Sequence, residues 1–97
     1  RRLPKLRMPR AETQATIVNR LGLHARPAMT FVDLAATFAS EILVRKDDTE
    51  VDGKSIMQMM MLAAAQGSVL TIVASGEDAQ TACEKLRKLI ESGFDED

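Results

Sequence analysis

The sequence predicts an α+β domain in which helices cover one face of a single β-sheet. In three segments, apolar residues recur at steps of three and four, which is typical of helices with one buried face. Four short segments are rich in β-branched residues or alternate between apolar and polar, which is typical of strands. The order is strand, helix, strand, strand, helix, strand, helix. One-sided helices and short strands in this order predict a two-layer, open-faced sandwich.

The first strand and the first helix flank a glycine break. Thr13–Arg20 is predicted to be a strand, and Gly22 ends it. A helix is predicted over Ala25–Ala39. Pro27 fits its first turn, because the first helical N–H groups have no intrahelical partner. This assignment places His24, the single histidine, at the N-terminal end of the helix. The predicted buried stripe is Ala28, Phe31, Val32, Ala35, Phe38 and Ala39.

The second and third strands form a predicted hairpin. Glu41–Lys46 and Thr49–Asp52 alternate in polarity, and Asp47-Asp48 supplies the turn. The acidic residues here lack the glycine and the terminal glutamate of a calcium-binding loop. We therefore expect a solvated hairpin and no metal site.

The second helix is predicted to begin at Ser55. Ser55 followed three residues later by Gln58 is a capping-box pattern, and Gly67 is the expected end of the helix. Met57 and Met61 lie off the buried stripe although they are apolar. The pattern leaves open whether they belong to the core or to a docking surface. The predicted core stripe is Ile56, Met59, Met60, Ala63 and Ala64.

The last strand and helix complete the sheet and its cover. Ser68–Ser75 is a nearly continuous apolar run, as in a covered central strand. Cys83 lies within the stripe of the last helix, so we interpret it as a small core residue rather than a reactive thiol. Residues 93–97 are predicted to be an acidic, frayed tail. The stripe of the last helix is Ala79, Ala82, Cys83, Leu86, Leu89 and Ile90.

Composition is that of one soluble domain. The 97 residues are 45% hydrophobic, and no apolar run approaches the roughly 20 residues that span a membrane. A single cysteine and the lack of a signal-like segment predict a cytoplasmic protein. The first ten residues hold five of the thirteen basic residues. We predict a disordered basic extension over residues 1–12; contact with nucleic acid or a membrane surface is the alternative.

His24 is the candidate for a residue that takes part in a reaction. A helix N-terminus presents unpaired N–H donors and the positive end of the helix dipole, so it favours an anion. An imidazole there, with Arg26 two residues on, can accept a phosphoryl group whose oxygens bind these donors. On spacing alone, a lone histidine at such a place is more often a solvated or capping residue, so the pattern by itself does not assign chemistry to His24.

Two motifs resemble those of a known family. The segment Gly22-Leu23-His24-Ala25-Arg26-Pro27-Ala28 resembles the active-site signature of HPr, the histidine phosphocarrier of the bacterial phosphoenolpyruvate-dependent phosphotransferase system. Gly53-Lys54-Ser55-Ile56-Met57 resembles the second motif of the same family and lies at the expected distance. The resemblance covers residues 13–92, which we take as the phosphocarrier domain. It implies an antiparallel sheet with the strand order 1-4-2-3.

The resemblance implies a carrier rather than a stand-alone enzyme, with no cofactor. His24 would accept a phosphoryl group on Nδ1 from phosphorylated enzyme I and pass it to an EIIA domain for sugar uptake. Arg26 and the helix opening at Ala25 and Pro27 would hold the phosphoryl oxygens. Ser55 would be phosphorylated for regulation by an HPr kinase/phosphorylase, beside the docking surface for these partners.

The implied protein is a monomer that neither inserts into membranes nor binds nucleic acid. One alternative is a regulatory paralogue, serving a nitrogen-related branch or catabolite control through protein contacts. Another is a small RNA-binding module, but the chain has no Tyr or Trp for stacking. The partner-binding residues that the resemblance implies are Met29, Ile56, Met57, Met60 and Met61.

Overall fold

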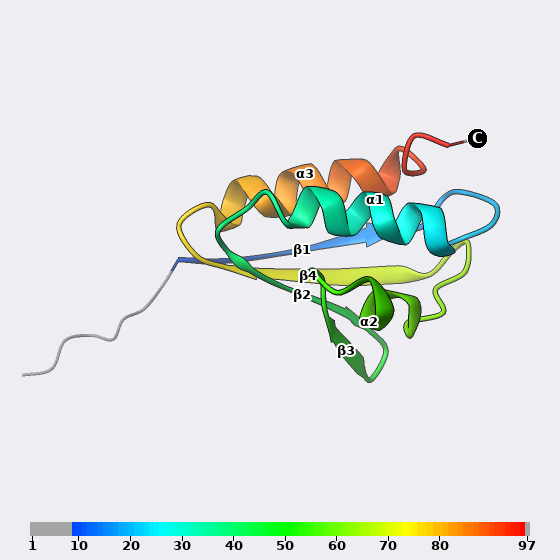
Figure 1. Ribbon diagram of the computed structural model, residues 1–97, viewed down its shortest axis with the longest axis horizontal. Helices are drawn as coiled ribbons and strands as arrows, with labels where there is room; N and C mark the ends of the chain where they lie inside the picture. The colour runs from blue at the N-terminus through cyan, green and yellow to red at the C-terminus, as the bar shows by residue number, and fades with distance from the viewer. Residues whose placement is uncertain (1–8, 97) are drawn as a thin grey trace, which may run out of the picture.

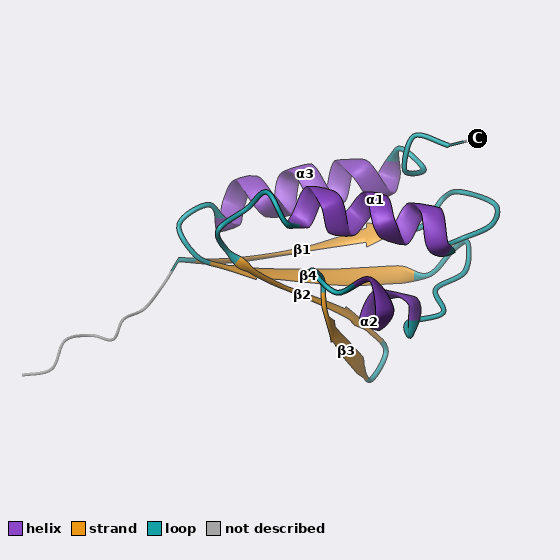
Figure 2. Cartoon of the chain, in the orientation of Figure 1, coloured by secondary structure: helices purple, strands orange, loops and turns teal. Residues whose placement is uncertain are grey.

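The computed structural model describes residues 9–96 and contains one four-stranded sheet with three helices (Figures 1 and 2). The strand order is β1-β4-β2-β3, and every neighbouring pair is antiparallel. This confirms the predicted fold class and the strand order implied by the resemblance. The elements are β1 (Arg10–Thr16), α1 (Ala25–Ala35), β2 (Glu41–Lys46), β3 (Thr49–Asp52), α2 (Ile56–Met60), β4 (Val69–Ser75) and α3 (Ala79–Glu91).

The helices share one face of the sheet. α1 and α3 lie side by side across β1, β4 and β2, and the short α2 packs against α1 and β3 (Figure 1). β4 has a partner strand on each side, so its backbone can pair along both edges, and most of its side chains are apolar. The hairpin of β2 and β3 has the predicted bounds, and Asp47 in its turn has a φ of 54°.

β1 begins and ends earlier than predicted. Arg10 pairs with Ser75 and Thr16 pairs with Val69, so β1 matches the full length of β4. Residues 10–12, assigned from the sequence to the N-terminal extension, are therefore part of the sheet. The expected disorder of residues 1–8 lies outside the described residues.

α1 is four residues shorter than predicted at its C-terminus. The amide of Thr37 donates to Leu34 O at 3.0 Å and the amide of Phe38 to Ala35 O at 3.2 Å, so the last turn tightens and then stops. Phe38 still packs against the core from this turn, whereas Ala39 is exposed, contrary to the predicted stripe.

α2 ends well before Gly67, the predicted stop. The helix spans only Ile56–Met60, and Ala63 has a φ of 47°, which an α-helix does not allow. Met60 and Ala63 are exposed, so their predicted place in the core stripe is wrong, while Met59 is fully buried.

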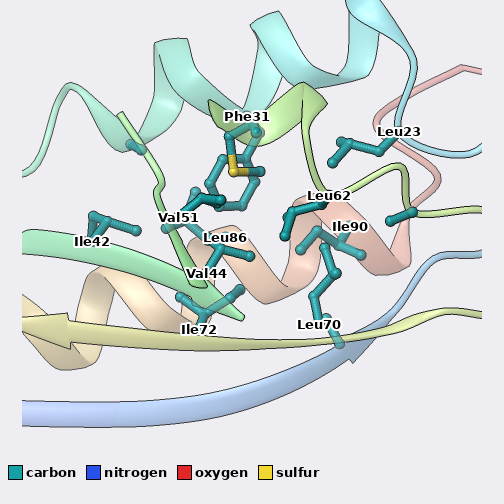
Figure 3. Close-up of a cluster of buried hydrophobic side chains, with 14 of the residues drawn as sticks. Leu23, Phe31, Ile42, Val44, Val51, Leu62, Leu70, Ile72, Leu86 and Ile90 are labelled. Carbon is teal, nitrogen blue, oxygen red and sulfur yellow. The ribbon is translucent and has the colours of Figure 1, made fainter. Parts of the chain in front are cut away.

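The core lies between the sheet and the helices (Figure 3). Phe31 of α1 faces aliphatic side chains from β2, β4 and α3, with Leu62 and Leu23 at the end near the start of α1. Cys83 is 2% exposed, and burial raises the pKa of its thiol. The structure thus confirms Cys83 as a core residue. The largest fully buried side chains are Phe31, Ile17, Ile42, Met59, Leu70, Ile72, Leu86 and Ile90.

Asp78 joins the start of α3 to the chain that enters β2. Its carboxylate accepts hydrogen bonds from the amides of Ala39 at 2.8 Å and Ser40 at 2.9 Å, and from the Ser40 hydroxyl. The bond from the hydroxyl of Ser40 contributes most to holding the pKa of Asp78 below its ordinary value. A lowered pKa means that the ionised carboxyl stabilises the folded state.

We expect the stabilisation from Asp78 to be present at neutral pH and lost on acidification. It is complete above the ordinary carboxyl pKa of about 3.9 and disappears as the pH falls through the lower folded pKa. Urea unfolding from pH 7 to pH 3 is the measurement. Asp78→Asn should have a lower free energy of unfolding than the parent at pH 7, and this difference should become smaller toward pH 3. A difference in free energy of unfolding that stays the same from pH 7 to pH 3 would contradict this role.

Candidate functional site

His24 occupies the N-cap of α1, as predicted. Its backbone is extended, with φ −84° and ψ −173°, and its side chain does not cap the helix. The first intrahelical bond runs from the amide of Ala28 to His24 O at 3.0 Å. The amides of Ala25 and Arg26 have no acceptor within residues 9–96, so they remain available to an anion. The ring itself is 37% exposed.

The Nε2 atom of His24 lies 3.1 Å from Oε1 of Glu96. The hydrogen bond from His24 contributes most to lowering the pKa of Glu96; desolvation opposes it, and a bond from Asn19 and the charge of Arg26 act with it. The carboxyl is therefore ionised at neutral pH and can only accept a hydrogen bond. In the neutral form of the ring, Nε2 must then carry the proton, which leaves the lone pair on Nδ1. Nδ1 has no hydrogen-bond partner within residues 9–96.

A left-handed turn brings Glu96 to this position. After α3 ends, Gly93, Phe94 and Asp95 have φ values of 78°, 59° and 62°. The amide of Phe94 donates to Leu89 O at 2.9 Å, and the ring of Phe94 is only 4% exposed. Figure 1 shows this C-terminal segment at the same end of the molecule as the start of α1. The predicted fraying of the tail is therefore wrong for residues 93–96.

Asn19 is the second contact that the sequence did not reveal. Its Nδ2 donates to Gly22 O at 2.8 Å and to Glu96 Oε1 at 2.9 Å, so it links the loop before His24 to the tail. The sequence gives only a weak indication that the C-terminal tail contacts Asn19. Phe94 is an apolar residue in an otherwise acidic tail, which indicates that the tail packs on the domain, but nothing local identifies what Glu96 contacts.

The other predicted residues of the helix opening divide into two groups. Ala25 and Arg26 are exposed, and the Arg26 guanidinium makes no side-chain hydrogen bond within residues 9–96. Its charge is near enough to lower the pKa of Glu96. Pro27 is buried and has no N–H, so it shapes the first turn but cannot donate to an anion.

The family is established by comparison with known proteins. The family model described as "PTS HPr component phosphorylation site" matches residues 11–92, which include His24 and Ser55. The chain belongs to the HPr family.

Relatives in that family cover most of the chain. Phosphocarrier protein HPr of Neisseria meningitidis serogroup A is 48% identical over 80 residues, which are 82% of this chain and 90% of that protein. Phosphocarrier protein NPr of Proteus mirabilis is 46% identical and covers 87% of this chain and 94% of its own. The crystal structure of HPr from Thermoanaerobacter tengcongensis superposes with a TM-score of 0.85 at 46% identity, over 90% of this chain and 98% of that one.

Ser55 lies in the second HPr motif and is the N-cap of α2, as predicted. Its Oγ accepts from the amide of Gln58 at 3.2 Å. The reciprocal half of a capping box is missing, because Oε1 of Gln58 accepts from the amide of Asp52 at 2.9 Å instead. Lys54, the preceding residue, donates to Phe38 O at 2.7 Å and ties this turn to the end of α1.

Four exposed methionines lie on α1, on α2 and at the residue directly after α2, and the two helices pack against each other. We call this set the methionine surface. Ile56, the other predicted contact residue, is only partly exposed and packs against the core. The exposed fractions are 76% for Met57, 70% for Met61, 51% for Met29 and 42% for Met60.

The described residues offer a surface rather than an enclosed site. Residues 9–96 contain no pocket and no group of three or more His, Cys, Asp or Glu side chains arranged to hold a metal ion. None of the helices in this range is long and apolar enough to cross a membrane. The His24 ring, 37% exposed, lies on this surface.

Proposed function

We propose that this HPr-family protein accepts a phosphoryl group on Nδ1 of His24 from phosphorylated enzyme I and passes it to an EIIA domain. The observation that carries the proposal is the state of the His24 ring: partly exposed at a helix N-terminus, with Nε2 hydrogen-bonded to Glu96 and Nδ1 without a partner within residues 9–96. The family membership supports the same assignment.

The transfer needs no other group from this chain than the imidazole. The Nδ1 lone pair forms a bond to phosphorus, the bond between phosphorus and its donor atom on enzyme I breaks, and the electron pair remains on the donor. The amides of Ala25 and Arg26 and the Arg26 guanidinium are the donors that we assign to the phosphoryl oxygens. Because the same bond must break again on EIIA, the protein is an intermediate of transfer rather than an enzyme with turnover.

The methionine surface fits a carrier with several partners. Methionine side chains adapt to different shapes, and the set is apolar and exposed beside α1, whose N-terminal end holds His24. We assign this surface and Ile56 to docking of enzyme I, EIIA and the kinase. One chain contains every residue of the proposed site, so we propose that it acts as a monomer. Membership of the HPr family supports a place in the cytoplasm.

Incubation with enzyme I and labelled phosphoenolpyruvate tests the carrier function. We expect one phosphoryl group per chain, lost in acid and kept in alkali, as the phosphorus–nitrogen bond of phosphohistidine requires. Addition of an EIIA domain should then remove the label. Absence of label, or a label that survives acid, would overturn the proposal.

We further propose that Ser55 is phosphorylated by an ATP-dependent HPr kinase. A phosphate at the N-terminus of α2 would be stabilised by the free amides there and would add about two negative charges beside the methionine surface. We expect acid-stable label on the parent protein with the kinase and ATP, and none on Ser55→Ala or Ser55→Asn.

The two variants separate modification from folding. Ser55→Ala removes the N-cap and should lower the free energy of unfolding by about 1 kcal/mol, whereas asparagine is an equally good cap. A Ser55→Asn protein with parental stability therefore tests the site without disturbing α2. Label that persists on Ser55→Asn would place the modification on another residue.

A second candidate is a paralogue that serves a nitrogen-related branch. The 46% identity with a protein named NPr favours it. The two functions use the same His24 chemistry and differ in partners, so transfer rates from the enzyme I proteins of the two branches distinguish them. The branch whose enzyme I phosphorylates this chain faster is the one it serves.

A further inference from the structure

Glu96, which contacts His24, lies beyond the family match, which ends at residue 92. The backbone that leads to Glu96 has an unusual conformation. Phe94 and Asp95 are non-glycine residues at positive φ, a conformation that L-residues rarely adopt, and Phe94 anchors the turn in the core. This turn places Glu96 beside the ring.

The carboxylate is fixed from a second side by Asn19. This amide is 4% exposed, and its Nδ2 donates both to Gly22 O and to Glu96 Oε1. Both of those acceptors lie on one side of the amide, so a flipped amide would face them with an oxygen and lose both bonds. Within residues 9–96, the titratable groups that face Glu96 are His24 and Arg26.

We propose that Glu96 is a positioning residue for phosphoryl transfer: its carboxylate keeps the proton of His24 on Nε2, so that Nδ1 presents its lone pair to the incoming phosphorus. The inference rests on the proposed function, because it concerns the same ring. Without an acceptor at Nε2, a neutral imidazole distributes its proton between the two nitrogens, and only one of these forms has a free Nδ1.

The same contact stabilises the positive charge that develops on the ring during transfer. When Nδ1 of a ring protonated at Nε2 bonds to phosphorus, the ring becomes positively charged. The Glu96 carboxylate, 3.1 Å from Nε2, attracts that charge more strongly in the transition state than it attracts the neutral ring before reaction. It thus favours both the correct proton position and the transfer step.

Three variants test this role. Glu96→Ala removes the acceptor, and Glu96→Gln keeps the size of the side chain but can pair with either form of the ring, because an amide both donates and accepts. Asp95→Asn removes the same charge from the neighbouring exposed residue, and asparagine tolerates the positive φ there, so it is the matched control.

The first measurement is the proton position on His24, from long-range nitrogen–proton NMR spectra of the ring at pH 8. We expect the Nε2–H form to predominate in the parent and in Asp95→Asn, and a mixture of both forms in Glu96→Ala and Glu96→Gln. The Phe94 ring resonances report whether the tail stays packed. A Glu96→Gln protein with a packed tail and the parental proton position would overturn the proposal.

The second measurement is the rate of label uptake from enzyme I. Loss of a hydrogen bond to a charged group predicts uptake about tenfold slower for Glu96→Ala and Glu96→Gln, and no change for Asp95→Asn. Parental or faster uptake in both Glu96 variants would overturn the proposal. The NMR measurement needs no partner protein, so a failure of Glu96 as positioning residue is distinguishable from a failure of the carrier function, in which the parent itself takes no label.

Discussion

His24→Ala is expected to abolish the acid-labile label that enzyme I and phosphoenolpyruvate place on the parent protein. His24 is the single histidine of the chain, so no other imidazole can accept the phosphoryl group. The expected result is complete loss rather than slower labelling, because the amides and Arg26 that we assign to the phosphoryl oxygens contain no nucleophile. Labelling followed by acid and alkaline treatment is the measurement.

The fold should survive this substitution. The His24 side chain makes no cap hydrogen bond, and Glu96 keeps its bond from Asn19 when the ring is removed. We expect the free energy of unfolding to change by about 0.5 kcal/mol or less, as for other partly exposed positions. Undiminished acid-labile label on a folded His24→Ala protein would contradict the assignment of His24.

The position of His24 was predictable because its determinants are local. Gly22 breaks the chain before the helix, and Pro27 fits only the first turn of a helix, so both determinants lie within one short stretch around His24. The hairpin of β2 and β3 was predictable for the same reason. Its alternation and its Asp47-Asp48 turn are adjacent in the chain.

The ends of α1 and α2 were not predictable from periodicity, because burial does not require a helix. Phe38 packs against the core from a turn, and Leu62 and Ala64 are 3% and 4% exposed in a segment without helical structure. Apolar residues therefore continue at helix-like spacing after the backbone has left the helix. The apolar periodicity therefore shows which residues are buried. It does not show where the helical backbone hydrogen bonds end.

The contact of Glu96 with His24 was hidden for a different reason. The two residues are 72 positions apart, and an acidic tail is ordinarily frayed. Its place depends on three consecutive residues at positive φ, of which only Gly93 is a glycine, and on the burial of Phe94. Such a turn is stable only when tertiary packing holds it, and composition does not encode that packing.

Gly22→Ala is expected to cause the largest loss of stability among the single substitutions considered. Gly22 has a φ of 69°, and an added Cβ would lie 2.6 Å from Ala64 O and 2.9 Å from Ala65 Cα. Both are backbone atoms, which cannot move aside as a flexible side chain can. Left-handed strain and overpacking together predict a loss of about 3–4 kcal/mol in the free energy of unfolding, measured with urea.

Gly67→Ala separates the two causes. Gly67 also has a positive φ, 93°, but an added Cβ would meet no atom within 4 Å, so only the backbone strain of about 1–2 kcal/mol remains. Equal losses in the two variants would mean that the loop at Gly22 shifts without cost and that the close approach to Ala64 is unimportant.

Gly22→Ala should also affect His24, because Ala64 O is the acceptor for the amide of Leu23 at 2.9 Å. A Cβ that pushes this carbonyl away displaces the residue directly before His24. The Gly22 carbonyl, which accepts from Asn19, would move with it, and the Asn19 contact to Glu96 would be disturbed. Label uptake by the folded fraction of Gly22→Ala should therefore be slower than by Gly67→Ala, since Gly67 contributes to neither contact.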